Sequence, residues 1–308
     1  QESYNPTFAL RYQPVDDVIL RASYGTGFTP PSVVQLVPAA PFFAASTFTD
    51  PKRGNESNSA SVAFISGGNP GLRPEESESW SGGVVFTPRL VPGLRLSVDY
   101  TRIDKTDNIT TLTRQQIVDN EAIFPDRVVR AAVTPGDPYG VGAITSVDFS
   151  SVNVAQAKVV AYDVQLDYER ETATAGRFAF YGYATWQPHY ETQLLPGLAF
   201  VENAGVSSAN PLRFKANAGV RWRRGPFSAG WSARYFDAYV VSSNATVVLN
   251  QGARMVPSQI YHDLTLGYRF TGGEAGSRFS RLFAGTEVQL AVKNILNERP
   301  PFDAGNAK

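Results

Sequence analysis

The sequence contains no cysteine, one methionine and two histidines. Without cysteine there is no disulfide framework, no thiolate catalysis and no cysteine-based metal site. His189 and His262 lie far apart and have no companion at a metal-binding spacing. No Gly-x-Ser-x-Gly motif occurs either. We therefore expect no catalytic residues, no metal and no cofactor, and we expect that the protein is not an enzyme.

The sequence also lacks an excess of charge of either sign and lacks long apolar runs. The 28 basic residues balance the 28 acidic ones, so no basic field favours nucleic acid as a partner. No apolar run approaches the ~20 residues of a spanning helix, which excludes a helical membrane protein. The mean hydropathy of −0.20 does not exclude a membrane β-barrel, because half of each barrel strand is polar.

What is present is a period-two alternation of apolar and polar residues, clearest in Leu94–Thr101. Many strands then carry one apolar and one charged face, with little helical pattern to cover either. A closed barrel in lipid satisfies both faces. We predict an all-β, antiparallel transmembrane β-barrel, present in part, with strands over Thr7–Gln13, Val18–Phe28, Ser77–Thr87, Leu94–Ile103, Ile144–Arg170, Phe178–His189, Leu212–Arg223, Phe227–Tyr239, Ile260–Phe270 and Thr286–Leu296.

One of these segments is longer than a membrane crossing needs. Ile144–Arg170 far exceeds the ~9–11 residues that span a bilayer. Splitting it would disturb the alternation of the connections described next. We therefore predict one strand that begins outside the membrane and is bulged near Asn153.

The connections alternate between short and long. This asymmetry is typical of outer-membrane barrels, in which short turns face the periplasm and long loops face outward. We expect a short helix within Gln115–Arg130 of one long loop. The short links are Pro14–Asp17, Pro88–Gly93, Glu171–Arg177 and Arg224–Pro226, with Thr271–Gly285 of medium length; the long ones are Thr29–Glu76, Asp104–Ala143, Tyr190–Pro211 and Val240–Gln259.

Two motifs carry a resemblance to a known family. The segment Tyr24–Ser32, followed by Gln35-Leu36, resembles a strand end and loop of TonB-dependent outer-membrane receptors. Asn69–Ser77 is similar to that family's Asn-Pro-x-Leu-x-Pro-Glu-x-Ser box, and Val292–Asn297 is a weaker match near the C-terminus. We interpret the motif residues as architectural: Gly25, Gly27, Phe28, Pro31, Asn69, Pro70, Leu72, Pro74, Glu75 and Ser77.

The resemblance covers essentially the whole chain and implies a barrel of about 22 strands closed by an N-terminal plug. Residues 1–308 would then be a C-terminal portion of that barrel, holding its strands twelve to twenty-one without the plug, with one further strand expected after Asn297. The implied partners are TonB, through the plug region, together with lipid and lipopolysaccharide of a Gram-negative outer membrane. The implied cargo is a scarce, bulky extracellular solute, an iron–siderophore first and an oligosaccharide as the alternative.

Candidate ligand-binding residues lie at the expected outer rim and on the expected lumen face. Rim aromatic residues can stack on a sugar or a catechol, although about half of such residues belong to the lipid-interface girdle. Lumen cations can bind an anionic solute. The candidates are Trp186, His189, Tyr190, Tyr239, Arg102 and Arg234.

Three other classes of protein remain alternatives. A passive porin-like barrel would need neither plug nor partner. A soluble β-sandwich or propeller lectin would have to cover the apolar strand faces. An outer-membrane hydrolase would require an external acid–base cluster, which the sequence does not display.

Overall fold

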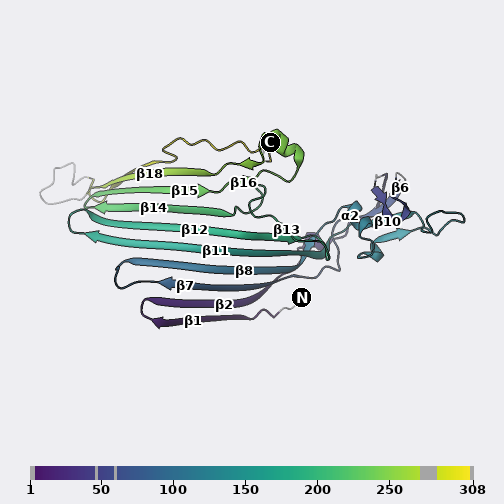
Figure 1. The fold of residues 1–308 in the computed structure, drawn as a ribbon, viewed down its shortest axis with the longest axis horizontal. Helices are drawn as coiled ribbons and strands as arrows, with labels where there is room; N and C mark the ends of the chain where they lie inside the picture. The colour runs from purple at the N-terminus through teal and green to yellow at the C-terminus, as the bar shows by residue number, and fades with distance from the viewer. Residues whose placement is uncertain (1–3, 46–47, 59–60, 271–282, 306–308) are drawn as a thin grey trace.

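The computed structural model describes residues 4–45, 48–58, 61–270 and 283–305. Its main element is a sheet in which strands follow one another in chain order, each antiparallel to the next (Figure 1). Within the described residues, β1 and β19 form the two edges, so the sheet is not closed. The strands are β1 (Thr7–Val15), β2 (Val18–Thr29), β7 (Glu75–Phe86), β8 (Leu94–Thr110), β11 (Val152–Thr172), β12 (Gly176–Gln193), β14 (Phe214–Arg224), β15 (Phe227–Phe236), β18 (Gln259–Arg269) and β19 (Glu287–Val292), with β13 (Val201–Glu202) paired to β12.

Each predicted segment overlaps one of these strands, and the register confirms the two-faced pattern. Val164 stands opposite Val98 and Ala184 across its neighbours, whereas Asp163 stands opposite Asp99 and Thr185. Cross-strand partners point to the same side of a sheet. One side of the sheet, here called the apolar face, is therefore aliphatic and aromatic, and the other, the polar face, carries the charges.

Ion pairs follow the polar face. The Arg21 guanidinium pairs with Asp99 across β7, and this contact has a steric requirement. A Cβ at Gly83, between the two residues, would lie 1.9 Å from the Asp99 carboxylate. Glycine therefore opens the gap that lets the pair form. Further pairs on this face are Arg95–Asp167, Arg234–Asp263 and Arg269–Glu287.

The apolar face carries two rows of aromatic rings. Near the long-loop end, Tyr162 lies between Tyr100 and Trp186, with ring centroids 5.3 and 5.1 Å away. Near the other end, Tyr168 and Phe180 stack at 5.9 Å. Two aromatic rows with aliphatic side chains between them are typical of the interface girdles of a membrane barrel.

The connections confirm the predicted asymmetry. Short turns lie at one end of the sheet and long connections at the other (Figure 1). Most of the predicted Thr271–Gly285 link lies outside the described residues. Two of the long connections, residues 30–74 and 111–151, fold together and are here called the loop module.

The loop module lies beyond the strand ends and has its own two small sheets and its own core (Figure 1). Its elements are α1 (Val33–Leu36), β3 (Phe42–Ala45), β4 (Phe48–Asp50), η1 (Pro51–Arg53), β5 (Glu56–Asn58), β6 (Ser61–Ile65), α2 (Arg114–Asp119), η2 (Pro125–Arg127), β9 (Val128–Arg130) and β10 (Ile144–Asp148), with sheets in the orders β3-β6-β10-β9 and β4-β5. Its apolar core includes Phe48, Val62, Phe64, Leu112, Ile117, Val118, Phe124, Val128, Ile144 and Val147, joined by Val152 and Leu195. The expected helix within Gln115–Arg130 corresponds to α2, capped by Thr113.

The prediction of a single strand over Ile144–Arg170 is wrong. Its first part is β10, which pairs with β6 and β9 of the loop module. The chain leaves that sheet at Ser150, where the Arg127 guanidinium binds the Ser150 carbonyl at 2.8 Å. The strand β11 then starts at Val152, and the bulge expected near Asn153 is confirmed by a register shift between Asn153 and Ala155.

The connection between β15 and β18 holds a small ribbon and a helix. The elements are β16 (Tyr239–Val240), α3 (Ala245–Gln251) and β17 (Met255–Val256), so the strand predicted over Phe227–Tyr239 ends early, at Phe236. None of the described helices is long and apolar enough to cross a membrane.

Candidate functional site

The two family-like motifs pair with each other. Gly25 and Gly27 of β2 stand opposite Ser79 and Ser77 of β7. The Ser79 hydroxyl donates to the Gly25 carbonyl at 3.1 Å, and the Ser77 hydroxyl donates to the Gly27 carbonyl at 3.3 Å. A Cβ at Gly27 would lie 3.0 Å from the Ser77 hydroxyl. The glycines thus leave room for the facing serines.

The second motif ties the loop module to the sheet. The Asn69 side chain donates to the Ser151 carbonyl at 3.1 Å and accepts from the Gly71 amide at 2.8 Å. Leu72 is buried. The Glu75 carboxylate binds the Lys105 ammonium at 3.0 Å and the Ile109 amide at 2.9 Å. These contacts support the architectural interpretation of the motif.

A pocket of about 210 Å³ lies against the strands β12, β14 and β15 near the long-loop end. The residues that line it on the polar face include two cations, Lys215 and Arg234, and the phenol of Tyr183. Arg234 also forms an ion pair with Asp263 at 3.2 Å. Thr185 of the same group donates to Asp163 at 2.6 Å. This group, called here the wall patch, consists of Tyr183, Thr185, Lys215, Asn217 and Arg234.

Tyr190 and Tyr239 lie at the same end as the wall patch. Tyr190 stands opposite Val159 of β11. Val159 and Asp163 point to the same side of β11, so the Tyr190 side chain lies on the polar face. Tyr239 donates to the Asp303 carboxylate at 2.7 Å. Burial together with Asp303 raises the pKa of Tyr239 to about 12. Tyr239 therefore fastens one loop to the C-terminal segment.

Three of the candidates predicted from the sequence point to the side of the apolar face, opposite to the wall patch. Trp186 is part of the aromatic row on the apolar face. The inward placement predicted for Arg102 is wrong, because Arg102 stands opposite Trp80 and pairs with Asp104 at 2.8 Å. His189 stands opposite Val160, on the side of Tyr162. β8 and β12 continue past the aromatic row, so charged side chains are solvated on either face there.

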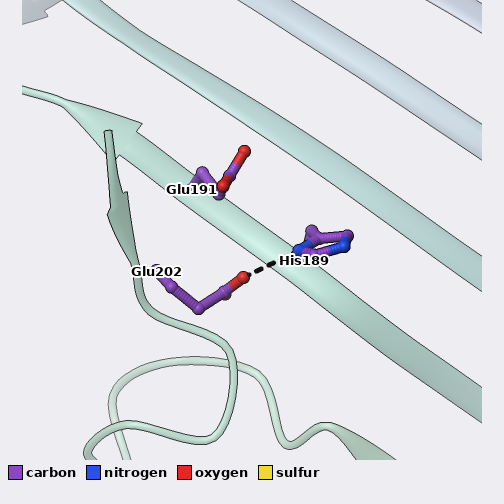
Figure 2. Close-up of side chains that lie close together, drawn as sticks. All are labelled: His189, Glu191 and Glu202. Atoms are coloured by element: carbon purple, nitrogen blue, oxygen red, sulfur yellow. Dashed lines mark hydrogen bonds and ion pairs between the residues drawn. The ribbon is translucent and has the colours of Figure 1, made fainter. Parts of the chain in front are cut away.

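His189 has a partner from outside its own strand. The loop after β12 returns as β13 and brings Glu202 opposite Glu191 (Figure 2). His189 Nδ1 lies 3.0 Å from Glu202 Oε2. Burial alone would raise the pKa of Glu202, but the amides of Tyr190 and Ala204 and the His189 ring lower it overall. No sequence motif signals this contact, because the short β13 has no repeated pattern.

The loop module contains a charged cluster that the sequence did not reveal. The Arg130 guanidinium binds Asp50 and Glu121, each at 2.7 Å, and Lys52 pairs with Glu121 at 3.1 Å. Hydrogen bonds from Arg130 are the largest influence on Glu121 and hold its pKa below its ordinary value. Asp50 is nearly fully buried, so its charge requires the arginine.

Comparison with known proteins agrees with this architecture. The family model for the β-barrel of TonB-dependent receptor-like proteins matches residues 1–295. The chain belongs to the TonB-dependent receptor family. No curated protein sequence matches the chain.

Solved structures share the fold at low sequence identity. The ferric enterobactin receptor PfeA of Pseudomonas aeruginosa, in complex with BCV-L6, aligns over 96% of this chain with a TM-score of 0.61 and 14% identity. The siderophore receptor PirA of Acinetobacter baumannii covers 98% with a TM-score of 0.58 and 13% identity. The FrpB iron transporter of Neisseria meningitidis covers 97% with a TM-score of 0.55 and 11% identity. The chain spans 36%, 38% and 36% of the lengths of these receptors.

Membership of the family assigns the two ends and the two faces. TonB-dependent receptors are outer-membrane β-barrels with a transport role. The long-loop end, with the loop module, corresponds to the extracellular side, and the apolar face corresponds to the lipid side. The polar face, which includes the wall patch and Tyr190, corresponds to the lumen wall.

Proposed function

We propose that this chain is the C-terminal part of the barrel of a TonB-driven receptor that imports an iron–siderophore across the outer membrane. The observation that carries the proposal is the family match over residues 1–295. The solved siderophore receptors of the same fold support the choice of cargo, and a PfeA variant has been solved in complex with enterobactin.

The wall patch supports an anionic, aromatic-rich cargo. Lys215 and Arg234 supply positive charge, and Tyr183 supplies a ring 45% exposed. Arginine and lysine attract anionic oxygens, and a tyrosine ring can stack on an aryl group. A ferric catecholate combines both features.

In the proposed mechanism the barrel performs no covalent chemistry. The extracellular loops and the upper lumen bind the solute, and the energised TonB partner acts through the plug region to open the path. The apolar face meanwhile contacts outer-membrane lipid and lipopolysaccharide. A conductive path that needs no partner would correspond instead to a passive porin-like barrel.

Uptake of radiolabelled ferric enterobactin tests the proposal in a strain that lacks its other siderophore receptors. We expect uptake that stops when the inner-membrane proton gradient collapses or when TonB is deleted. Uptake that persists after collapse of the gradient would contradict the TonB-driven mechanism. Uptake of a labelled oligosaccharide with none of the siderophore would contradict the proposed cargo.

A pair of variants tests the wall patch. Arg234→Gln removes a cation at the extracellular end, and we expect the uptake KM to rise about tenfold, the value of one charged hydrogen bond. Arg269→Gln is the matched control, since Arg269 forms an equivalent ion pair with Glu287 at the opposite end of the same wall. Equal effects of the two variants would contradict a binding role for the wall patch.

A further inference from the structure

The contact between β12 and β13 brings three potential metal ligands together outside the lumen. His189 and Glu191 are two residues apart on β12 and so share a face, and Glu202 stands opposite Glu191. His189 offers one ring nitrogen, and Glu191 and Glu202 offer one carboxylate oxygen each; these three atoms all lie within 4.8 Å of one another. Figure 2 shows the three side chains on the two strands, with His189 joined to Glu202.

The donor set fits a first-row transition dication. One imidazole nitrogen and two carboxylate oxygens are ligands of zinc and related ions, at bond lengths of about 2.0–2.2 Å. Two such ligands on a tetrahedral ion stand roughly 3.4 Å apart. The observed separations therefore need only side-chain rotations, and solvent fills the remaining coordination positions.

Glu202 is held in position for such a role. Its Oε1 accepts from the Tyr190 amide at 3.0 Å and from the Ala204 amide at 2.8 Å, which leaves Oε2 toward His189. Hydrogen bonds of this kind orient metal-binding carboxylates. The His189 side chain is 54% exposed, so an ion can enter from solvent.

The charge of the site favours a cation. The Glu191 and Glu202 carboxylates carry two negative charges when ionised, which a dication balances. Lys158 stands opposite Glu191 in register, but its ammonium lies 4.0 Å from the centre of the Phe200 ring. The Lys158 ammonium is therefore engaged with the Phe200 ring.

We propose that His189, Glu191 and Glu202 form a binding site for a divalent transition-metal ion such as Zn²⁺, on the outward face of the extracellular rim. The ion joins β13 to β12 and so fastens the connection between β12 and β14. It is separate from the transported cargo, because the site faces away from the lumen.

Zinc titration of the receptor purified from outer membranes in detergent tests this site. We expect saturable binding of one Zn²⁺ by calorimetry, and Co²⁺ is expected to give a visible absorption spectrum at the same stoichiometry. His189→Ala and Glu202→Gln should each weaken binding at least tenfold. Residues 1–308 contain two histidines and no cysteine. His262→Ala is therefore the matched control and should leave binding unchanged.

Two further outcomes decide the proposal. Zinc should slow hydrogen exchange of residues 190–205 in the wild type and in His262→Ala, but not in His189→Ala. Absence of saturable binding at millimolar zinc, or equal affinity in wild type and His189→Ala, would overturn the proposal and leave an ordinary His189–Glu202 ion pair. Siderophore uptake by His189→Ala, measured separately, is expected to stay within twofold of wild type, so this test does not depend on the proposed cargo.

Discussion

The membrane sheet and the loop module contain the same kinds of apolar residue but use them in opposite ways. Leu290 in the sheet is 61% exposed and Trp80 is 51% exposed, whereas Phe64 in the loop module is fully buried. Charges are reversed as well: Arg269 on the lumen wall is largely solvated, and Asp50 in the module is buried against Arg130. The module thus resembles a water-soluble domain, with an apolar core, attached to a wall that needs lipid.

The difference shows that two environments stabilise one chain: water around the loop module and membrane hydrocarbon around the sheet. Burial of a large apolar side chain contributes about 1.5–3 kcal/mol in water, and the module obtains this from its own core. The sheet obtains it from hydrocarbon outside the protein and obtains its rigidity from the backbone ladder. Substitutions that test one region should therefore have little effect in the other.

The largest effect is expected in the module core. Phe64→Ala should destabilise the loop module by about 3–5 kcal/mol, because it leaves a cavity among packed rings. Hydrogen exchange of β6 and β10 amides measures the loss. The matched control is Leu266→Ala, because the Leu266 side chain lies on the apolar face and is 47% exposed. If both variants cost the same in their own regions, the distinction between core and lipid face is wrong.

A charge placed on the lipid side should be nearly as costly. Val164 lies between the two aromatic rows. Val164→Arg should therefore lower the unfolding free energy in bilayers by about 2–4 kcal/mol. The adjacent Gln165→Arg lies on the polar face near Asp167, and its cost should be below about 1 kcal/mol, as expected for a solvated surface charge. Urea unfolding in lipid vesicles compares the two, and a reversed order would exchange the assigned faces.

Neighbouring glycines give an intermediate effect. Gly83→Ala places a Cβ against Asp99 and should cost about 1–3 kcal/mol through overpacking. Gly82→Ala points to the other face, where the nearest atom is 4.0 Å away, and should change stability little. The same unfolding measurement applies, and equal costs would contradict the described register.

The smallest effect concerns pH and should be confined to the loop module. The folded state holds the pKa of Glu121 below its ordinary value of 4.5. The ionised Glu121 therefore stabilises the module above that pH, and this contribution is lost as the pH falls below 4.5 through the folded pKa. Hydrogen exchange in the module should rise with acidification, and Glu121→Gln should remove this part of the dependence. An unchanged dependence in Glu121→Gln would rule out this carboxylate.

The strands of the main sheet were predicted well from the sequence, because strand periodicity is a local signal. The ten strands from β1 to β19 that follow one another in the main sheet each overlap a predicted segment, and the alternation of short turns and long loops was predicted as well. The loop module was not foreseen, because its core joins residues as distant as Phe48 and Val128 and no period marks such contacts. Ile144–Asp148 was assigned to the same strand as β11 because a split would have disturbed the alternation of short and long connections.

The candidate site was predicted only in part. Arg234 lies on the polar face as expected, and Tyr190, which was predicted at the outer rim, points to the same side. Arg102 was placed inward because charge was taken to mark the lumen, yet β8 extends past the aromatic row, where both faces meet water. Glu202 was missed because only the return of β13 brings it to His189.

The central claim is that this chain forms a wall with one lipid side and one water side. Residues 1–308 contain no cysteine, so single cysteines can be introduced at positions 161 to 168 of β11. The most direct measurement attaches a spin label to each of them in the receptor reconstituted into bilayers. The account predicts that oxygen accessibility peaks at the even positions and that accessibility to a water-soluble nickel chelate peaks at the odd ones. Uniform accessibility, or the opposite phase, would contradict it.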